Sequence, residues 1–222
     1  MKVGTIRNRN AANDTVDNLS TVSQDVPLYC AARAPTCRRA GYAHCDERER
    51  RTTGRAVRRG LRRPAASSVD DLVSRALADD WVVRVIATPM GERFIDGPLL
   101  AAMTGDRVRT EFRMPDEPDE LPKADAVVVA PATFNTINKW AAGVTDTFAA
   151  GLLCELTGVG VPILAVPLVK DELARHVAFG QSLKVLRGMG VRILFDPQAP
   201  PQARMPSWPR VLEELHAVVG KV

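Results

Sequence analysis

Asp125-Ala-Val-Val-Val-Ala-Pro-Ala-Thr-Phe-Asn-Thr136 is the stretch that decides the fold of this 222-residue chain. Its first half is continuously apolar, which is typical of a strand buried on both faces of a parallel sheet. Thr133, Asn135 and Thr136 follow where the strand leads into a helix. Exposed N–H groups and short polar side chains at a helix start suit an anion or a polar heterocycle. Plain capping of the helix by Thr133 or Asn135 would explain the same residues, so binding and capping both stay open.

Similar strand and helix patterns lie on both sides of this stretch. Short apolar strands that alternate with helices indicate a parallel sheet covered on both faces, joined by right-handed crossovers. We therefore expect a single α/β domain over residues 65–222, with a doubly wound, Rossmann-like parallel sheet and helices on both faces. The expected strands are 81–87, 125–130, 161–167 and 191–195, and the expected helices are 67–77, 94–103, 135–156, 171–189 and 206–219.

Ligands of doubly wound folds bind beyond the carboxyl ends of the strands. The residues that follow the predicted strands are 88–93, 131–138 and 167–173. We expect the functional site to be built from these three loops.

The loop after the central strand also carries a family resemblance. Pro131-Ala-Thr-Phe-Asn-Thr136 resembles the Pro-Ala-Ser-Ala-Asn-Thr signature of the FMN-dependent cysteine decarboxylase flavoproteins, which include phosphopantothenoylcysteine decarboxylases and lantibiotic peptidyl-cysteine decarboxylases. Ile137-Asn-Lys-Trp-Ala-Ala-Gly-Val-Thr-Asp146 is similar to the family's continuation, with a Lys, an Ala-Gly pair and an Asp at matching spacings. Thr88-Pro-Met-Gly-Glu-Arg-Phe-Ile95 resembles the family's strand-end Thr and Phe-Ile.

The resemblance implies an FMN cofactor and assigns residues to it. Thr88 would contact the FMN phosphate, and Met90, Phe94 or Phe134 would form an apolar wall beside the ring. A small-molecule substrate and a homo-oligomer, for which a trimer is one option, are also implied. The implied cofactor-binding set is Thr88, Phe94, Pro131, Ala132, Thr133, Asn135, Thr136 and Asp146, in which Thr133, Asn135 and Thr136 line the isoalloxazine with Asp146 nearby.

Two departures from the family pattern leave the catalytic residues unassigned. Active decarboxylases carry a His shortly before the central strand, whereas residues 117–125 hold none and Glu117 falls near its place. Their Pro-x-Met-Asn-x-x-Met-Trp substrate clamp corresponds to Pro167-Leu-Val-Lys-Asp-Glu-Leu-Ala174, where Lys170 replaces the Asn. His176 could act as a general acid or base, or lie on the helix surface.

Three functions therefore remain open. The first is redox or lyase chemistry of the decarboxylase type on an unknown small substrate. The second is a non-catalytic FMN-binding module with a sensing or regulatory role. The third is a transferase like the flavin prenyltransferases, against which the absence of a glycine- and serine-containing loop after a first strand counts.

Residues 1–64 differ from the rest of the chain in charge. They carry 14 Lys+Arg against 6 Asp+Glu, a net +8, whereas residues 65–222 carry 16 against 20, a net −4. We expect either a disordered basic tail or, as a second hypothesis, an out-of-frame translation before about Pro64, since Arg-rich sequence arises when GC-rich DNA is read in the wrong frame.

Several partners and locations are not expected. No aromatic residue interleaves with the arginines of residues 48–63, so nucleic-acid binding is not predicted. Cys30, Cys37, His44 and Cys45 lack the spacing of a zinc knuckle, so no metal is predicted. The chain has no apolar run long enough for a transmembrane helix and no apolar leader, from which a cytoplasmic location is expected.

Overall fold

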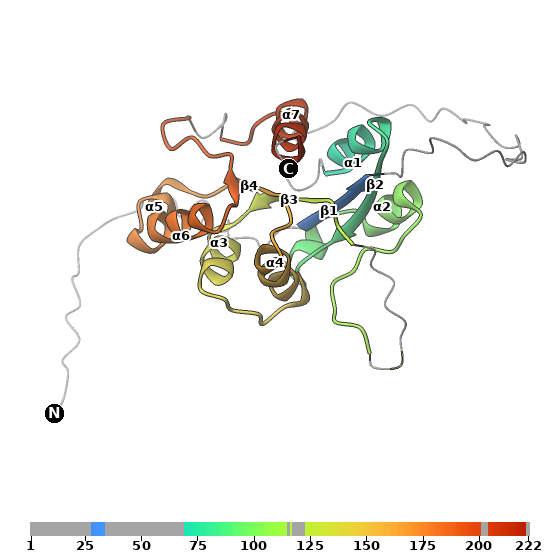
Figure 1. Ribbon diagram of the computed structural model, residues 1–222, viewed down its shortest axis with the longest axis horizontal. Coiled ribbons are helices and arrows are strands. Elements are labelled where there is room, and N and C mark those ends of the chain that lie inside the picture. Colours follow the sequence, from blue (N-terminus) through green and yellow to red (C-terminus); the bar gives the residue numbers. More distant parts are fainter. Residues whose placement is uncertain (1–27, 34–68, 115, 117–122, 201–203, 221–222) are drawn as a thin grey trace, which may run out of the picture.

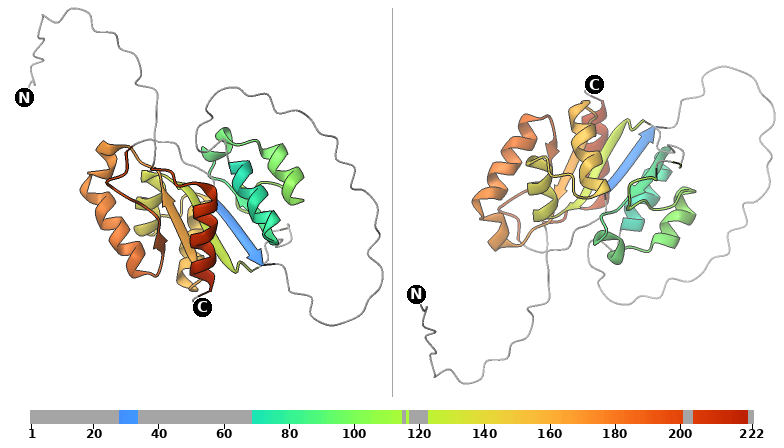
Figure 2. Two further views of the ribbon diagram at one scale, coloured as in Figure 1. Left: turned by 90° about the horizontal axis from the view of Figure 1, so that it is seen from above. Right: turned by 90° about the horizontal axis from the view of Figure 1, so that it is seen from below.

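The computed structural model describes residues 28–33, 69–114, 116, 123–200 and 204–220. Its five-stranded sheet has the order β2-β1-β3-β4-β5, with helices on both faces (Figures 1 and 2). Among the described helices, none has both the length and the apolar composition that a membrane span requires. The elements are β1 (Leu28–Arg33), α1 (Val69–Ala78), β2 (Trp81–Ile86), η2 (Gly91–Phe94), α2 (Gly97–Thr104), β3 (Ala126–Ala132), α3 (Phe134–Ala141), α4 (Phe148–Gly158), β4 (Ile163–Pro167), α5 (Asp171–Ala174), α6 (Val177–Gly188), β5 (Arg192–Ile193) and α7 (Trp208–Val219).

The central strands are buried on both faces, as their continuous apolar sequence predicts. Val128 and Leu164 face a core formed with α1, α2 and α7, whereas Val127 and Ile163 face a second core formed with α3, α4 and α6. Figure 1 shows α1 and α7 on one side of the sheet and α3 and α4 on the other. The predicted doubly wound α/β architecture is therefore confirmed.

One strand departs from the predicted parallel sheet. β3, β4 and β5 are parallel, but β1 runs antiparallel to both of its neighbours, β2 and β3. Leu28 of β1 pairs with Ile86 on one side and with Val129 on the other. Without β1, the facing backbone N–H and C=O groups of β2 and β3 would lack partners inside the sheet, and such groups are costly to leave unpaired.

β1 belongs to residues 1–64, which we expected to stand apart from the fold. This six-residue part of the segment pairs within the sheet. Residues 34–64, which include the Arg-rich stretch before Pro64 on which the frame hypothesis rests, lie outside the described residues, and so do Cys37, His44 and Cys45. β1 is thus the part of the basic segment that the structure describes.

Two long predicted helices are each divided. The predicted helix 135–156 ends at Ala141, because Gly143 takes a left-handed φ of 70° and Thr147 caps a new helix, α4. The predicted helix 171–189 is divided into α5 and α6. His176 lies between them and caps α6, because its side chain accepts a hydrogen bond from the Ala178 N–H. Apolar spacing continues across both breaks, which is why the sequence pattern did not reveal them.

The other boundaries shift by smaller amounts. The predicted helix 94–103 begins with the short turn η2 and then α2, which Asp96 caps through the Leu99 N–H. β5 is only two residues long, whereas we predicted a strand over 191–195. A single parallel bridge between Arg109 and Ile86, not anticipated from the sequence, extends the sheet beyond β2.

Candidate functional site

The loop after β2 begins with a buried threonine. Thr88 is 8% exposed, and its hydroxyl accepts a hydrogen bond from the Gly91 N–H at 3.0 Å. The Glu92 N–H bonds to the Thr88 carbonyl at 3.0 Å, which forms the η2 turn. Within the described residues, the Thr88 hydroxyl has no acceptor for its own hydrogen. A buried O–H group with an unused donor is suited to an anionic oxygen supplied by a ligand.

The loop after β3 begins in a similar way. Thr133 is 4% exposed and caps α3, since its hydroxyl accepts from the Thr136 N–H at 3.4 Å. The two hydroxyl oxygens of Thr133 and Thr136 are also 3.1 Å apart and share a hydrogen bond. The capping alternative raised by the sequence is thus confirmed for Thr133. The remaining N–H groups of the first turn of α3, with the helix dipole behind them, are suited to a polar or anionic ligand.

Pro131 and Ala132 contribute to this loop differently from the threonines. Both are buried, and Ala132 packs into the core that includes α3 and α4. The Ala132 carbonyl accepts a hydrogen bond from the Leu168 N–H at 2.9 Å, which fastens the loops after β3 and β4 to each other. These two residues therefore shape the loop, while Asn135 and Thr136 after them are only half-buried.

Asn135 lies half-buried in the first turn of α3. Within the described residues its side-chain amide forms no hydrogen bond, so both its donors and its acceptor are available. Asn138, one turn further along α3, accepts a hydrogen bond from the Ser182 hydroxyl at 2.7 Å and links α3 to α6. Asn138 thus uses its amide oxygen within the fold, and Asn135 is the better candidate for a ligand contact.

The loop after β4 lies beside the start of α3. His176 packs edge-on against Phe134 with ring centroids 5.7 Å apart, and Phe134 stacks on Phe179 at 6.2 Å. Phe134 is therefore committed to packing between α3 and α6. His176 is exposed, and its Nδ1 accepts a hydrogen bond from the Ala178 N–H. Its Nε2 takes no part in this bond.

An arginine distant in sequence holds the loop after β4 in place. Arg204, whose side chain is 10% exposed, donates to the Val169 carbonyl at 3.2 Å and to the Ala199 carbonyl at 3.3 Å, and pairs with Asp171. Lys170 lies between the two residues of this loop that Arg204 holds, exposed, at the start of α5. Sequence analysis missed Arg204, because a pairing across 33 residues leaves no local pattern.

The structure separates Asp146 from the start of α3. Asp146 lies in the connection between α3 and α4 and forms an exposed ion pair with Lys139, in the last turn of α3, at 2.9 Å. Phe94 is half-buried in η2, and Met90 is 37% exposed at the start of the same turn. Most of the residues assigned to the cofactor follow the carboxyl ends of β2 and β3, which point the same way because both strands run antiparallel to β1. Asp146 lies at the other end of α3.

Other reactive groups do not gather in this region. Burial raises the pKa of the Cys154 thiol, and the nearby Glu155 carboxylate raises it further. The thiol is thus protonated near neutral pH and is a weak nucleophile. In the part of the chain that the structure describes, no group of three His, Cys, Asp or Glu residues is placed to hold a metal ion.

Comparison with known proteins gives matches over the part of the chain that contains these loops. A family model described as Flavoprotein matches residues 65–220. The bifunctional coenzyme A biosynthesis proteins CoaBC of Mycobacterium bovis and Mycobacterium tuberculosis (strain H37Rv) are each 33% identical over 118 residues, which are 50% of this chain and 27% of the relative. The match thus spans about a quarter of the length of these curated relatives.

Solved structures share the fold. HAL3 from Cryptococcus neoformans has a TM-score of 0.56 at 22% identity, over 69% of this chain and 90% of that chain. The FMN-dependent cysteine decarboxylase TvaF, from thioviridamide biosynthesis, has a TM-score of 0.55 at 19% identity, with the same shares covered. The cypemycin decarboxylase CypD has a TM-score of 0.55 at 20% identity, over 69% of this chain and 86% of that chain.

The family match covers more than two thirds of the chain and includes the loops after β2, β3 and β4. The doubly wound sheet is the fold that these similar structures have. This chain belongs to the flavoprotein family.

Proposed function

We propose that the chain binds FMN at the carboxyl ends of β2 and β3 and acts as a decarboxylase-like flavoprotein on a small substrate. The observation that carries this proposal is the pair of buried threonines, Thr88 and Thr133, each in the loop that follows a strand and each accepting a hydrogen bond from the N–H group three residues later. Family membership and the FMN-dependent cysteine decarboxylases among the similar folds support the choice of cofactor.

The polar groups of the two loops fit the needs of FMN. The phosphate and the pyrimidine edge of the flavin both require hydrogen-bonding partners in a site that is otherwise apolar. Thr88 has a buried hydroxyl hydrogen without an acceptor among the described residues, and the Asn135 amide has unused donors and an acceptor. We assign Thr88 to the phosphate, and Thr133, Asn135 and Thr136 to the polar edge of the ring.

Apolar side chains would cover the rest of the ring. Met90 and Phe94 of the turn after β2 are exposed and half-buried, and are the candidates for this wall. Phe134 is the weaker candidate, because it already stacks on Phe179. FMN, when bound, supplies the two-electron redox chemistry that none of the protein side chains can provide.

The substrate would lie against the loop after β4. This loop is fastened to the β3 loop through Leu168 and anchored by Arg204, so its exposed residues are held at the same edge of the sheet. Lys170 stands where the related clamp has an Asn, and an ammonium group there would attract an anionic substrate group as a point charge. This replacement also favours a second candidate, a non-catalytic FMN-binding module with a sensing or regulatory role.

We also propose a homo-oligomer, for which a trimer is one arrangement, in the cytoplasm. Support for a subunit contact comes from large apolar side chains on the surface. Phe112 and Met114 are 56% and 62% exposed, and Val144 in the α3–α4 connection is 40% exposed. Exposed apolar groups of this size are typical of protein contacts.

The first experiment is a visible absorption spectrum of the purified chain, followed by denaturation and mass analysis of the released chromophore. We expect flavin bands and FMN; a well-folded preparation that is colourless and does not bind added FMN would contradict the proposal. Anaerobic incubation with phosphopantothenoylcysteine or a peptide ending in cysteine, assayed for CO₂, then separates an enzyme from a binding module. The preparation is made from the sequence as given and, in parallel, from the alternative reading frame upstream of Pro64.

A further inference from the structure

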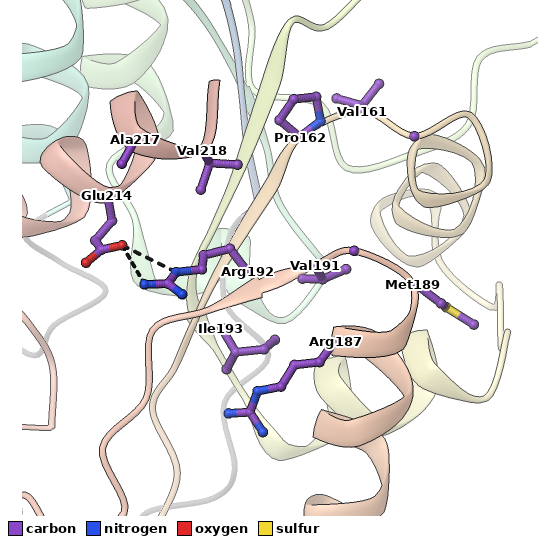
Figure 3. A pocket seen from close by; sticks show the side chains of 12 residues that line it. Val161, Pro162, Arg187, Met189, Val191, Arg192, Ile193, Glu214, Ala217 and Val218 are labelled. Carbon is purple, nitrogen blue, oxygen red and sulfur yellow. Dashed lines mark hydrogen bonds and ion pairs between the residues drawn. The ribbon is translucent and has the colours of Figure 1, made fainter. Parts of the chain in front are cut away.

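A hollow of about 610 Å³ lies at the opposite edge of the sheet from the two threonine loops. It opens between the amino ends of β4 and β5, the end of α6 and the second half of α7 (Figure 3). Its volume is within the range of small-molecule sites. The lining residues are Gly160, Val161, Pro162, Arg187, Met189, Gly190, Val191, Arg192, Ile193, Glu214, Ala217 and Val218.

Two glycine turns keep this hollow open. Gly160 and Gly190 have left-handed φ values of 77° and 88°, and no atom lies within 4 Å of the place where a Cβ would be at either position. Beneath them, Val191 is buried, and Val161 and Ile193 are half-buried. The hollow therefore has an apolar floor that the described side chains do not fill.

Of the two arginines that line the hollow, only Arg192 has an ion-pair partner among the described residues. Glu214 is the acidic residue among those that line it, and it is only 8% exposed. Its Oε2 accepts hydrogen bonds from Arg192 at 3.1 and 3.4 Å, and its Oε1 is taken by Arg210. Since both carboxylate oxygens are used, no acid of the lining remains for Arg187, which forms no ion pair with any described residue.

We propose that this hollow binds a small amphipathic carboxylate. The apolar body would rest on Val191, Ile193 and Val218, and the carboxylate would pair with Arg187. Figure 3 shows Arg192 directed to Glu214 of α7, whereas Arg187 extends from α6 and is joined to none of the residues drawn. One guanidinium group donates two parallel hydrogen bonds to a carboxylate, so Arg187 can hold this group without a second cation.

A purely structural role for Arg187 is the competing possibility. Arg187 lies in the last turn of α6, where a positive charge offsets the negative end of the helix dipole. That role needs no ligand, and it would be the same for any ligand charge. A comparison of ligands that differ only in charge therefore separates the structural role from the binding role.

The test is a titration of the full-length chain, labelled with ¹³C at the Ile and Val methyl groups, with octanoate and with octylammonium. We expect octanoate to shift the methyl signals of Val191, Ile193 and Val218, and octylammonium to leave them in place. Arg187→Gln should weaken octanoate binding by about tenfold or more, because a charge-assisted hydrogen bond is lost. Lys184→Gln is the matched control, since it removes an exposed cation of the same helix that is not part of the lining, and it should leave the affinity unchanged.

Two further measurements establish where octanoate binds. Ala217→Trp fills the hollow from an exposed position and should abolish octanoate binding without unfolding the chain. Saturating FMN should not displace octanoate, because the flavin loops lie at the other edge of the sheet. The proposal is overturned if octanoate causes no shifts at millimolar concentration, if octylammonium causes the same shifts, if Arg187→Gln binds as well as the parent, or if FMN competes.

Discussion

The loops after β2 and β3 begin alike and continue differently. In each, a buried threonine at the strand end accepts a hydrogen bond from the N–H group three residues later, Gly91 for Thr88 and Thr136 for Thr133. Thr133 then shares a second hydrogen bond with the Thr136 hydroxyl and starts an eight-residue helix. Thr88 starts only the four-residue turn η2. Thr133 thus mainly supports the fold of the loop after β3, whereas the Thr88 hydroxyl in the loop after β2 is left available for a ligand.

The largest effect is expected from Thr133→Val, because this change removes both a helix cap and a ligand contact. The free energy of unfolding should fall by about 1–2 kcal/mol, which lowers the melting temperature by roughly 2–8 °C. FMN affinity should fall by about tenfold or more, measured by fluorescence quenching of the free flavin. Thr133→Ser keeps the hydroxyl and should restore most of both quantities.

Thr88→Val should lower FMN affinity more than it lowers stability. We expect FMN affinity to fall by about tenfold, since a hydroxyl bond to a charged phosphate is lost. The melting temperature should fall less than in Thr133→Val, because η2 is shorter than α3 and lies next to exposed Met90. Equal losses of stability in the two variants, with Thr88→Ser as control, would remove the distinction between the loops.

Asn135→Ala is expected to act on the ligand alone. FMN affinity should weaken by about threefold to tenfold, the value of a neutral hydrogen bond. The free energy of unfolding should stay within about 0.5 kcal/mol of the parent, because the amide bonds to no described residue. A large drop in melting temperature without a change in affinity would assign Asn135 to the fold.

Asp146→Asn should have the smallest effect. It breaks an ion pair in which Lys139 and Asp146 have side chains 37% and 49% exposed, and such pairs contribute about 0–1 kcal/mol. FMN affinity, measured by the same fluorescence titration, should change by less than about twofold, because Asp146 pairs with the last turn of α3. A tenfold weakening would instead support the contact with the flavin that the family resemblance implies.

The sequence predicted the central strands well because burial on both faces leaves a continuous apolar run. β3 and β4 lie within two residues of their predicted bounds for this reason. The division of helix 135–156 could not be predicted, since Ile137, Phe148 and Leu152, which pack in the same core, keep a helical spacing across the break. The break itself depends on the left-handed Gly143 and the Thr147 cap, which are local and easily masked by that spacing.

The site was predictable to the extent that it is local in sequence. Thr88, Thr133, Asn135 and Thr136 follow strand ends, and the structure places them in the turns expected from that position. The Arg204–Asp171 pair joins residues 33 positions apart, and the Asn138–Ser182 bond joins residues 44 positions apart. No local sequence pattern could therefore predict these contacts. The antiparallel direction of β1 likewise depends on pairing with β2 and β3, far along the chain.

The first turn of α3 is held by contacts that form independently of any ligand. The Thr133 hydroxyl and the Phe179 ring against Phe134 hold this turn, and the Ser182 hydroxyl on Asn138 holds the next one. Its amide groups are thus aligned before a cofactor arrives, and association needs little additional ordering of the backbone. Cofactor binding should then leave amide hydrogen exchange in α3 nearly as slow as it already was, while the turn at Met90 becomes markedly more protected.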